Sequence, residues 1–220
     1  MTMNTHDKII KKAAAEVLVP LGVFQKGQSR TWIDDNGWFL TIIEFKPSDW
    51  GKGVHLHVGV HYLWNNGDTL SMDYSSNDSR SVDYTGSDDK FSADMMELAA
   101  FAKDKVLYYR SFADIIFARN MIVKNDAVYP WSTWDKMMVC FLISDVGRGR
   151  NFYNSAVAET KDDYRDWAQE IHERATHRIA PILSNHDSLK KYVLFSIRDS
   201  RCFWREKNSM TKLKIDETYG

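Results

Sequence analysis

Residues 29–45 read SRTWIDDNGWFLTIIEF, and this stretch decides the fold. It holds two apolar, β-branched runs, Ser29 to Asp34 and Trp38 to Phe45, which are separated by Asp35-Asn36-Gly37. Asn-Gly between such runs is a strong signal for a β-hairpin, because both residues tolerate positive φ. The sequence therefore predicts two antiparallel strands here.

Further strand patterns follow along the chain. A third strand is expected at Val54 to Trp64, and a second Asn-Gly turn at Asn65 to Asp68 leads to a fourth strand at Thr69 to Tyr74. A fifth strand near Ser81 to Tyr84 is an open alternative. Asp73 to Lys90 otherwise reads as a long loop, since it is rich in Ser, Asp and Gly. These runs predict an antiparallel meander of four or five strands.

The period of two in these strands also assigns side chains to the two faces of the sheet. One face is apolar and must be covered by helices. Its members are Trp32, Phe39, Thr41, Ile43, Phe45, Val54, Leu56, Val58 and Val60. The other face is mixed in character, and we expect about half of it to be exposed. Its members are Trp38, Leu40, Ile42, Glu44, His55, His57, Gly59 and His61.

Helical periodicity stands on both sides of the sheet. A first helix is expected at about Thr5 to Leu21, stopped by Pro20 and Gly22. After the sheet, one helix carries an apolar stripe from Met95 to Tyr109. Three capping-box patterns, beginning at Ser111, Ser132 and Thr160, predict further helix starts, of which the second helix ends near Gly147. A last helix is expected from Asp187 to about Lys207.

The predicted fold class is α+β. An N-terminal helix comes first, then the meander, then four to five helices packed on the sheet. We expect a single domain over residues 1–220, with a sheet half at about 1–90 and a helical half at about 91–220.

Composition excludes several classes. The chain has 220 residues, of which 44% are hydrophobic, and its net charge of −1 does not indicate nucleic acid as a partner. The longest apolar run, Met137 to Ile143, is far too short to span a membrane, and no apolar signal core follows Met1. Two cysteines, Cys140 and Cys202, form no disulfide framework. We therefore expect a cytoplasmic protein without membrane association, and the oligomeric state is not indicated.

The run His55-Leu56-His57 suggests chemistry. Side chains two apart on a strand share a face, ~6.5 Å from each other. Two imidazoles so placed bind one metal ion when a third ligand is near, and Glu44 of the neighbouring strand is the candidate. The alternative is an ordinary polar face that binds nothing. No complete catalytic constellation is present, so we expect no cofactor and do not favour an enzyme, while a divalent metal remains the alternative.

Charge is uneven along the chain. Asp68 to Glu97 holds eight acids and two bases, whereas Asp187 to Lys214 holds eight bases and three acids. Three of these bases follow i, i+3, i+7 helical spacing and are expected to line one stripe. Interface hot spots combine Arg with aromatic side chains. The candidate binding residues are therefore Arg198, Arg201, Arg205, Trp38, Trp50 and His61. The alternative is two solvated segments that attract each other.

Residues 21–32 read LGVFQKGQSRTW, and residues 45–48 read FKPS. The first 65 residues or so resemble the opening of an uncharacterised bacterial family, a domain of unknown function. Its members begin with a helix, a Gly-Phe-x-Lys-Lys-Gly-like turn, an aromatic strand and a Phe-Gln-Lys-Ser-like strand end. Val23 and the Lys46-Pro47 pair depart from that pattern. The resemblance implies a helix–meander–helices layout, carries over no catalytic residue, and hints at an immunity, defence or accessory role.

Three functions follow as hypotheses. The first is a cytoplasmic binding or accessory protein that acts through a protein partner. The second is a metal-dependent hydrolase built on Glu44, His55 and His57. The third is a nucleic-acid accessory factor that uses Arg198, Arg201 and Arg205.

Overall fold

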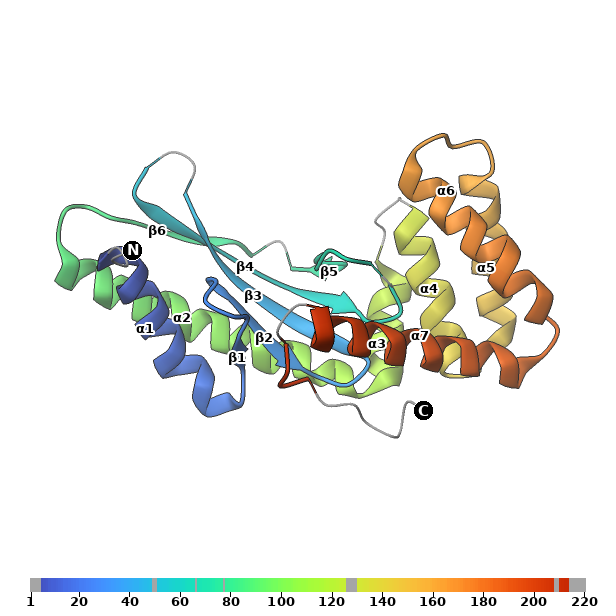
Figure 1. Cartoon of the computed structure of the whole chain (residues 1–220), viewed down its shortest axis with the longest axis horizontal. Coiled ribbons are helices and arrows are strands. Elements are labelled where there is room, and N and C mark those ends of the chain that lie inside the picture. Colours follow the sequence, from blue (N-terminus) through green and yellow to red (C-terminus); the bar gives the residue numbers. More distant parts are fainter. Residues whose placement is uncertain are drawn as a thin grey trace. The chain divides into compact units, whose positions relative to one another are not determined.

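The structure is a computed structural model that describes residues 5–48, 51–65, 67–76, 78–125, 130–207 and 210–213 (Figure 1). Contacts divide the chain into two compact units. The sheet unit takes the described residues within Met1–His61, Asp68–Ser111 and Arg201–Ile215, and the helical unit takes those within Tyr62–Gly67 and Phe112–Ser200. The units differ from the expected halves because residues 91–111 and 201–213 belong with the sheet.

The α+β class is confirmed: an N-terminal helix, an antiparallel sheet and several helices follow one another along the chain. The sheet has six strands in the order β1-β2-β3-β4-β5, and β6 also pairs with β4. The strands are β1 (Phe24–Gln25), β2 (Thr31–Asp35), β3 (Phe39–Pro47), β4 (Gly53–Tyr62), β5 (Tyr74–Ser75) and β6 (Arg80–Asp83).

The predicted hairpin joins β2 to β3, with Trp32 opposite Ile43 and Asp35 opposite Leu40. The Asn36 N–H donates to the Phe39 carbonyl at 3.1 Å, so Gly37 and Trp38 are the two turn residues. Gly37 has φ +83°, a conformation that a glycine adopts without a steric penalty. The turn therefore lies one residue later than the Asn-Gly pair suggests, and Trp38 is a turn residue rather than part of the strand.

The expected strand at Thr69 to Tyr74 is wrong. The chain leaves the end of β4 and returns only at β5, where Tyr74 lies opposite Val60 and Ser75 opposite Gly59. On the way, Met72 covers Gly59: a Cβ on that glycine would lie 2.8 Å from the Met72 Cβ. The expected long loop at Asp73 to Lys90 is also wrong in part, because it contains both β5 and β6.

Two helices cover the apolar face of the sheet, α1 (Thr5–Leu18) and α2 (Asp88–Arg110), and they pack against each other (Figure 1). The predicted stripe on α2 is confirmed, with every member from Met95 to Tyr109 buried. After α1, a 3-10 turn at Val19–Leu21 ends at Gly22, which has φ +83° and donates its N–H to the Val19 carbonyl. This is the stop that Pro20 and Gly22 predict.

The helical unit contains α3 (Ile115–Lys124), α4 (Pro130–Leu142), α5 (Val146–Thr160), α6 (Asp166–Glu173) and most of α7 (His186–Lys207). A π-helical turn at Arg174–Ile179 and a 3-10 turn at Ala180–Ile182 lie between α6 and α7. Within the described ranges, no helix is long and apolar enough to cross a lipid bilayer.

None of the three capping-box residues is the N-cap of an α-helix, and Ser111 begins a 3-10 turn at Ser111–Ala113 instead. Asp114 is the N-cap of α3, and its carboxylate accepts from the N–H groups of Ile116 and Phe117. Ser132 lies inside α4. Thr160 is the last residue of α5, where its hydroxyl donates to the Ala156 carbonyl at 2.7 Å. A hydroxyl that bonds back along its own helix satisfies itself without a cap, so the spacing alone misleads.

The expected C-cap at Gly147 is also wrong. Helix α4 ends earlier, at Leu142, and Ser144 after it has φ +63°. The Asp145 N–H donates to the Cys140 carbonyl and the Ser144 N–H to the Phe141 carbonyl, the two bonds of a Schellman motif. Gly147 instead lies in the first turn of α5.

Candidate functional site

The mixed face of the sheet is less exposed than expected, since Trp38, Leu40, Ile42, Gly59 and His61 are buried. At its open end His57 is exposed and Glu44 and His55 are half-buried, whereas Ile42 and Leu40 at the other end are buried. The second end is buried because residues from Arg201 onward cover it: Arg201 contacts the hairpin turn, and Trp204 lies against His61. The open end is thus a polar surface beside a closed, apolar one.

The hypothesis of a metal site rests on Glu44, His55 and His57. Among the described residues, no three or more His, Cys, Asp or Glu side chains come together as a metal ion requires. The three candidates share the open end of the mixed face without forming such a group. The metal site therefore stays a prediction from sequence.

His61 lies at the closed end of the mixed face and is 1% exposed. Its Nδ1 is 3.2 Å from Oδ2 of Asp73 and 3.3 Å from Oγ of Ser71, and Ser71 donates to Asp73. Its ring meets the Trp204 ring edge-on, with centroids 6.1 Å apart. Because it is enclosed, His61 cannot touch a partner directly, which corrects its assignment as a binding residue.

The predicted arginine stripe is not a single exposed surface. Arg198 and Arg205 are exposed, but Arg201 is 2% exposed and pairs with Asp35. Helical spacing places the three on one side of α7 without saying what covers the middle one. Of the two tryptophan candidates, Trp38 is buried in the hairpin turn, and Trp50 lies outside the described residues.

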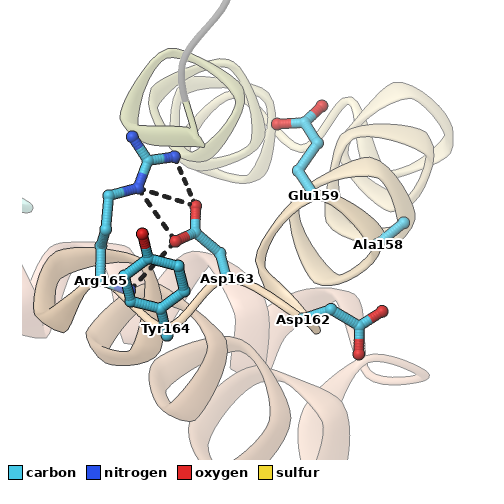
Figure 2. Close-up of a pocket in the computed structure, with 6 residues that line it drawn as sticks. All are labelled: Ala158, Glu159, Asp162, Asp163, Tyr164 and Arg165. Atoms are coloured by element: carbon cyan, nitrogen blue, oxygen red, sulfur yellow. Dashed lines mark hydrogen bonds and ion pairs between the residues drawn. The ribbon is translucent and has the colours of Figure 1, made fainter.

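A shallow hollow of about 460 Å³ lies at the turn between α5 and α6 (Figure 2). The guanidinium of Arg165 forks onto the carboxylate of Asp163 and lowers its pKa. Glu159 accepts a hydrogen bond from Thr133, and Tyr164 is 91% exposed. The hollow is open and polar, and the one cation among its described lining residues, Arg165, pairs with Asp163. It therefore does not define a site.

A groove of about 400 Å³ in the sheet unit has a different character. It runs between strand β6 and helix α2. Its lining residues are Arg80, Ser81, Val82, Asp83, Thr85, Lys90, Asp94, Glu97 and Leu98. Val82 is half-buried and Leu98 is buried, so the groove has an apolar floor between charged walls.

Local structure explains how the groove forms. In the ladder between β4 and β6, Val82 lies opposite Val54 and Arg80 opposite Leu56, which puts both side chains on the face that α2 covers. The Arg80 guanidinium stacks over the Phe101 ring of α2 at 3.9 Å. Helix α2 begins immediately after β6, at the N-cap Ser87, whose side chain accepts from the Lys90 N–H. Strand and helix therefore lie side by side and enclose the floor.

The groove lining is weakly acidic, with Asp83, Asp94 and Glu97 against Arg80 and Lys90. From Asp83 to Glu97 the sequence holds five carboxylates and one amine. The amine, Lys90, pairs with Asp94 at 2.7 Å, so it neutralises a carboxylate of its own helix. Glu97 places its carboxylate on the α2 wall, whereas Asp83, like Ser81, turns its side chain to the other face of the sheet. The exposed carboxylates of α2's first turn extend the acidic surface.

The sequence shows two parts of this site, but it does not show that the fold brings them together. The acidic run from Asp68 to Glu97 and the optional strand near Ser81 are both visible in the sequence. Strand β6 pairs with β4, and this pairing between segments distant in the sequence cannot be read from local patterns. Without this pairing, β6 would not lie beside α2 and the groove would not form.

Comparison with known proteins finds no matching family model, no matching curated protein and no matching solved structure.

Proposed function

We propose that this protein is a binding protein that acts through a protein partner, and that the groove between β6 and α2 holds a basic segment of that partner. The observation that supports the proposal is an apolar floor, Val82 and Leu98, beside the carboxylate of Glu97, in a lining with three carboxylates and two cations. Interfaces commonly combine an apolar centre with a charged rim, and the rim charge selects the partner.

A cytoplasmic location belongs to the same proposal. Both cysteines are free, with Cys140 buried and Cys202 half-buried, which suits a reducing compartment. An immunity or accessory role is a narrower form of the proposal and rests on the resemblance of the first 65 residues.

The test begins with a selection of random ten-residue peptides, displayed on phage, against the full chain. We expect the enriched peptides to be basic. The affinity of a synthetic enriched peptide, measured by fluorescence anisotropy, should fall about tenfold for Glu97→Lys, because charge reversal on the wall repels a basic segment. Asp104→Lys makes the same charge change at an exposed position of α2 outside the groove and should leave the affinity unchanged.

Two results would contradict the proposal. One is a selection that enriches no peptide. The other is an enriched peptide that binds Glu97→Lys as well as it binds the unchanged chain.

Elemental analysis of protein purified without an affinity tag distinguishes the binding proposal from the rival hypothesis of a metal-dependent hydrolase. Stoichiometric zinc, manganese or iron that disappears in a His57→Ala variant would favour the rival. The binding proposal expects no such metal at this position.

A further inference from the structure

We infer that the partner segment binds as an additional β-strand along the outer edge of β6. This inference rests on the proposed function and specifies how the groove is used. It follows from the direction of the backbone groups of β6.

Strand β6 pairs with β4 in a register that can be followed bond by bond. The Tyr84 N–H donates to the Lys52 carbonyl at 2.6 Å, one step beyond the pair Gly53 and Asp83. In an antiparallel ladder, hydrogen-bonded pairs alternate with pairs that exchange no bonds. Val82 with Val54 and Arg80 with Leu56 are therefore the bonded pairs.

The remaining residues of β6, Ser81 and Asp83, turn their backbone N–H and C=O groups away from β4. In the part of the chain that the structure describes, β4 is the one sheet neighbour of β6. Both residues are exposed. Such an edge offers a template on which another strand can add, with two donors and two acceptors spaced two residues apart.

The groove lies on one side of that template. Successive side chains of an added strand point to opposite faces of the sheet. Those on the α2 side enter the groove, above Val82 and Leu98 and beside Glu97. Those on the other side lie beside the side chains of Ser81 and Asp83, on the open end of the mixed face. An apolar residue with a Lys or Arg two positions away therefore fits the groove.

Charge distinguishes this occupant from a second copy of the chain. Pairing two β6 edges would bring the carboxylates that flank this edge in two copies together, Asp83 on one face and Glu97 on the other. Like charges placed side by side in a sheet are destabilising. A basic segment of a different protein meets the same edge with attraction.

The test applies N-methylation, one amide at a time, to the basic peptide enriched by the selection. Methylation removes a hydrogen-bond donor and blocks strand pairing at that residue. If the peptide adds to β6, methylation at alternate residues weakens binding by at least about tenfold, and methylation at the residues between them leaves it intact. If the positions at which methylation weakens binding do not alternate along the peptide, the inference is overturned.

A variant of the protein tests the same contact from the other side. Ser81→Pro removes an N–H that the ladder to β4 does not use, and edge strands tolerate proline. It should weaken peptide binding by at least about tenfold, while Ser81→Ala, which keeps the N–H, binds normally. If Ser81→Pro fails to fold, as judged by circular dichroism, the methylated peptides decide alone.

The outcomes separate the inference from the proposed function. A peptide that depends on Glu97 but shows no alternation and binds Ser81→Pro normally overturns strand addition and leaves the basic-partner proposal standing. A dimer in light scattering that Ser81→Pro dissociates makes a second copy the occupant and overturns the inference. A peptide affinity that does not change in Glu97→Lys contradicts both the inference and the proposed function.

Discussion

Arg201 donates two hydrogen bonds to the carboxylate of Asp35, from Nη1 to Oδ1 at 2.8 Å and from Nη2 to Oδ2 at 2.6 Å. Nη1 also donates to the Gly37 carbonyl, so the guanidinium closes the turn of the hairpin. The preceding carboxylate, Asp34, points to the other face and accepts from Arg110 of α2 at 2.7 Å. Two successive aspartates thus tie α2 and the last turns of α7 to one hairpin.

Arg201→Met should lower the free energy of unfolding by about 3–5 kcal/mol, because it leaves the largely buried carboxylate of Asp35 without its cation. Urea unfolding measures the loss. Arg205→Met, at an exposed position of the same helix, should change stability by no more than about 0.5 kcal/mol. The double variant Asp35→Asn with Arg201→Met removes both charges and should recover part of the loss. Equal stability of the two single variants would show that the pair contributes nothing.

The hairpin could be predicted from the sequence, but the ion pair of Asp35 with Arg201 could not. Alternating β-branched residues around Asn-Gly act within a few residues, so the sequence displays them directly. Arg201 is 166 residues from Asp35, and helical spacing cannot say which face of α7 will be covered. The same limit applies to the misplaced strand at Thr69 to Tyr74, where pairing with β4 begins only at Tyr74.

Two glycines of α5 offer an internal comparison. A Cβ on Gly149 would collide with Cε1 of the buried Phe141, whereas a Cβ on Gly147 would meet nothing within 4 Å. Gly149→Ala should therefore destabilise the protein by about 1–3 kcal/mol through overpacking between α4 and α5. Gly147→Ala should stabilise it by about 0.5–1 kcal/mol, since alanine favours a helix more than glycine does.

Thermal and urea unfolding of the two variants check these opposite signs. Adding Phe141→Leu to Gly149→Ala should recover part of the loss. A destabilising Gly147→Ala, or a neutral Gly149→Ala, would contradict the packing seen between these helices.

The two thiols should differ in reactivity. Burial raises the pKa of the Cys140 thiol to about 11, with Asp145 adding to the shift. At pH 8 about one Cys140 thiol in a thousand is then ionised, and the thiolate is the reactive form. Cys202 is half-buried. A disulfide reagent such as DTNB should modify Cys202 in the folded protein and Cys140 only after unfolding.

Counting modified thiols in native buffer and in guanidinium tests this difference. Cys202→Ser should abolish the native reaction and keep one thiol reactive in guanidinium. Two thiols of equal rate in the native protein would mean that α4 opens readily.

The candidate site shows how far sequence patterns reach. Residue spacing predicts that Glu44, His55 and His57 share one face, because strand alternation is local. It also placed His61 on that face, but not under the ring of Trp204, because burial depends on which distant segment arrives there. The acidic groove needed both the local charge run and the pairing of β6 with β4.

His57 and His61 of β4 should therefore respond differently to substitution. His57 is exposed, so His57→Gln should change the free energy of unfolding by no more than about 0.5 kcal/mol. His61 is enclosed, and its Nδ1 lies 3.2 Å from Asp73. His61→Phe keeps an aromatic ring against Trp204 but removes the group that faces Asp73, so we expect a loss of about 1–3 kcal/mol. Urea unfolding at pH 7 measures both variants. If His57→Gln proves the more costly change, His57 must contact a group that this fold does not place beside it, and the metal hypothesis would gain ground.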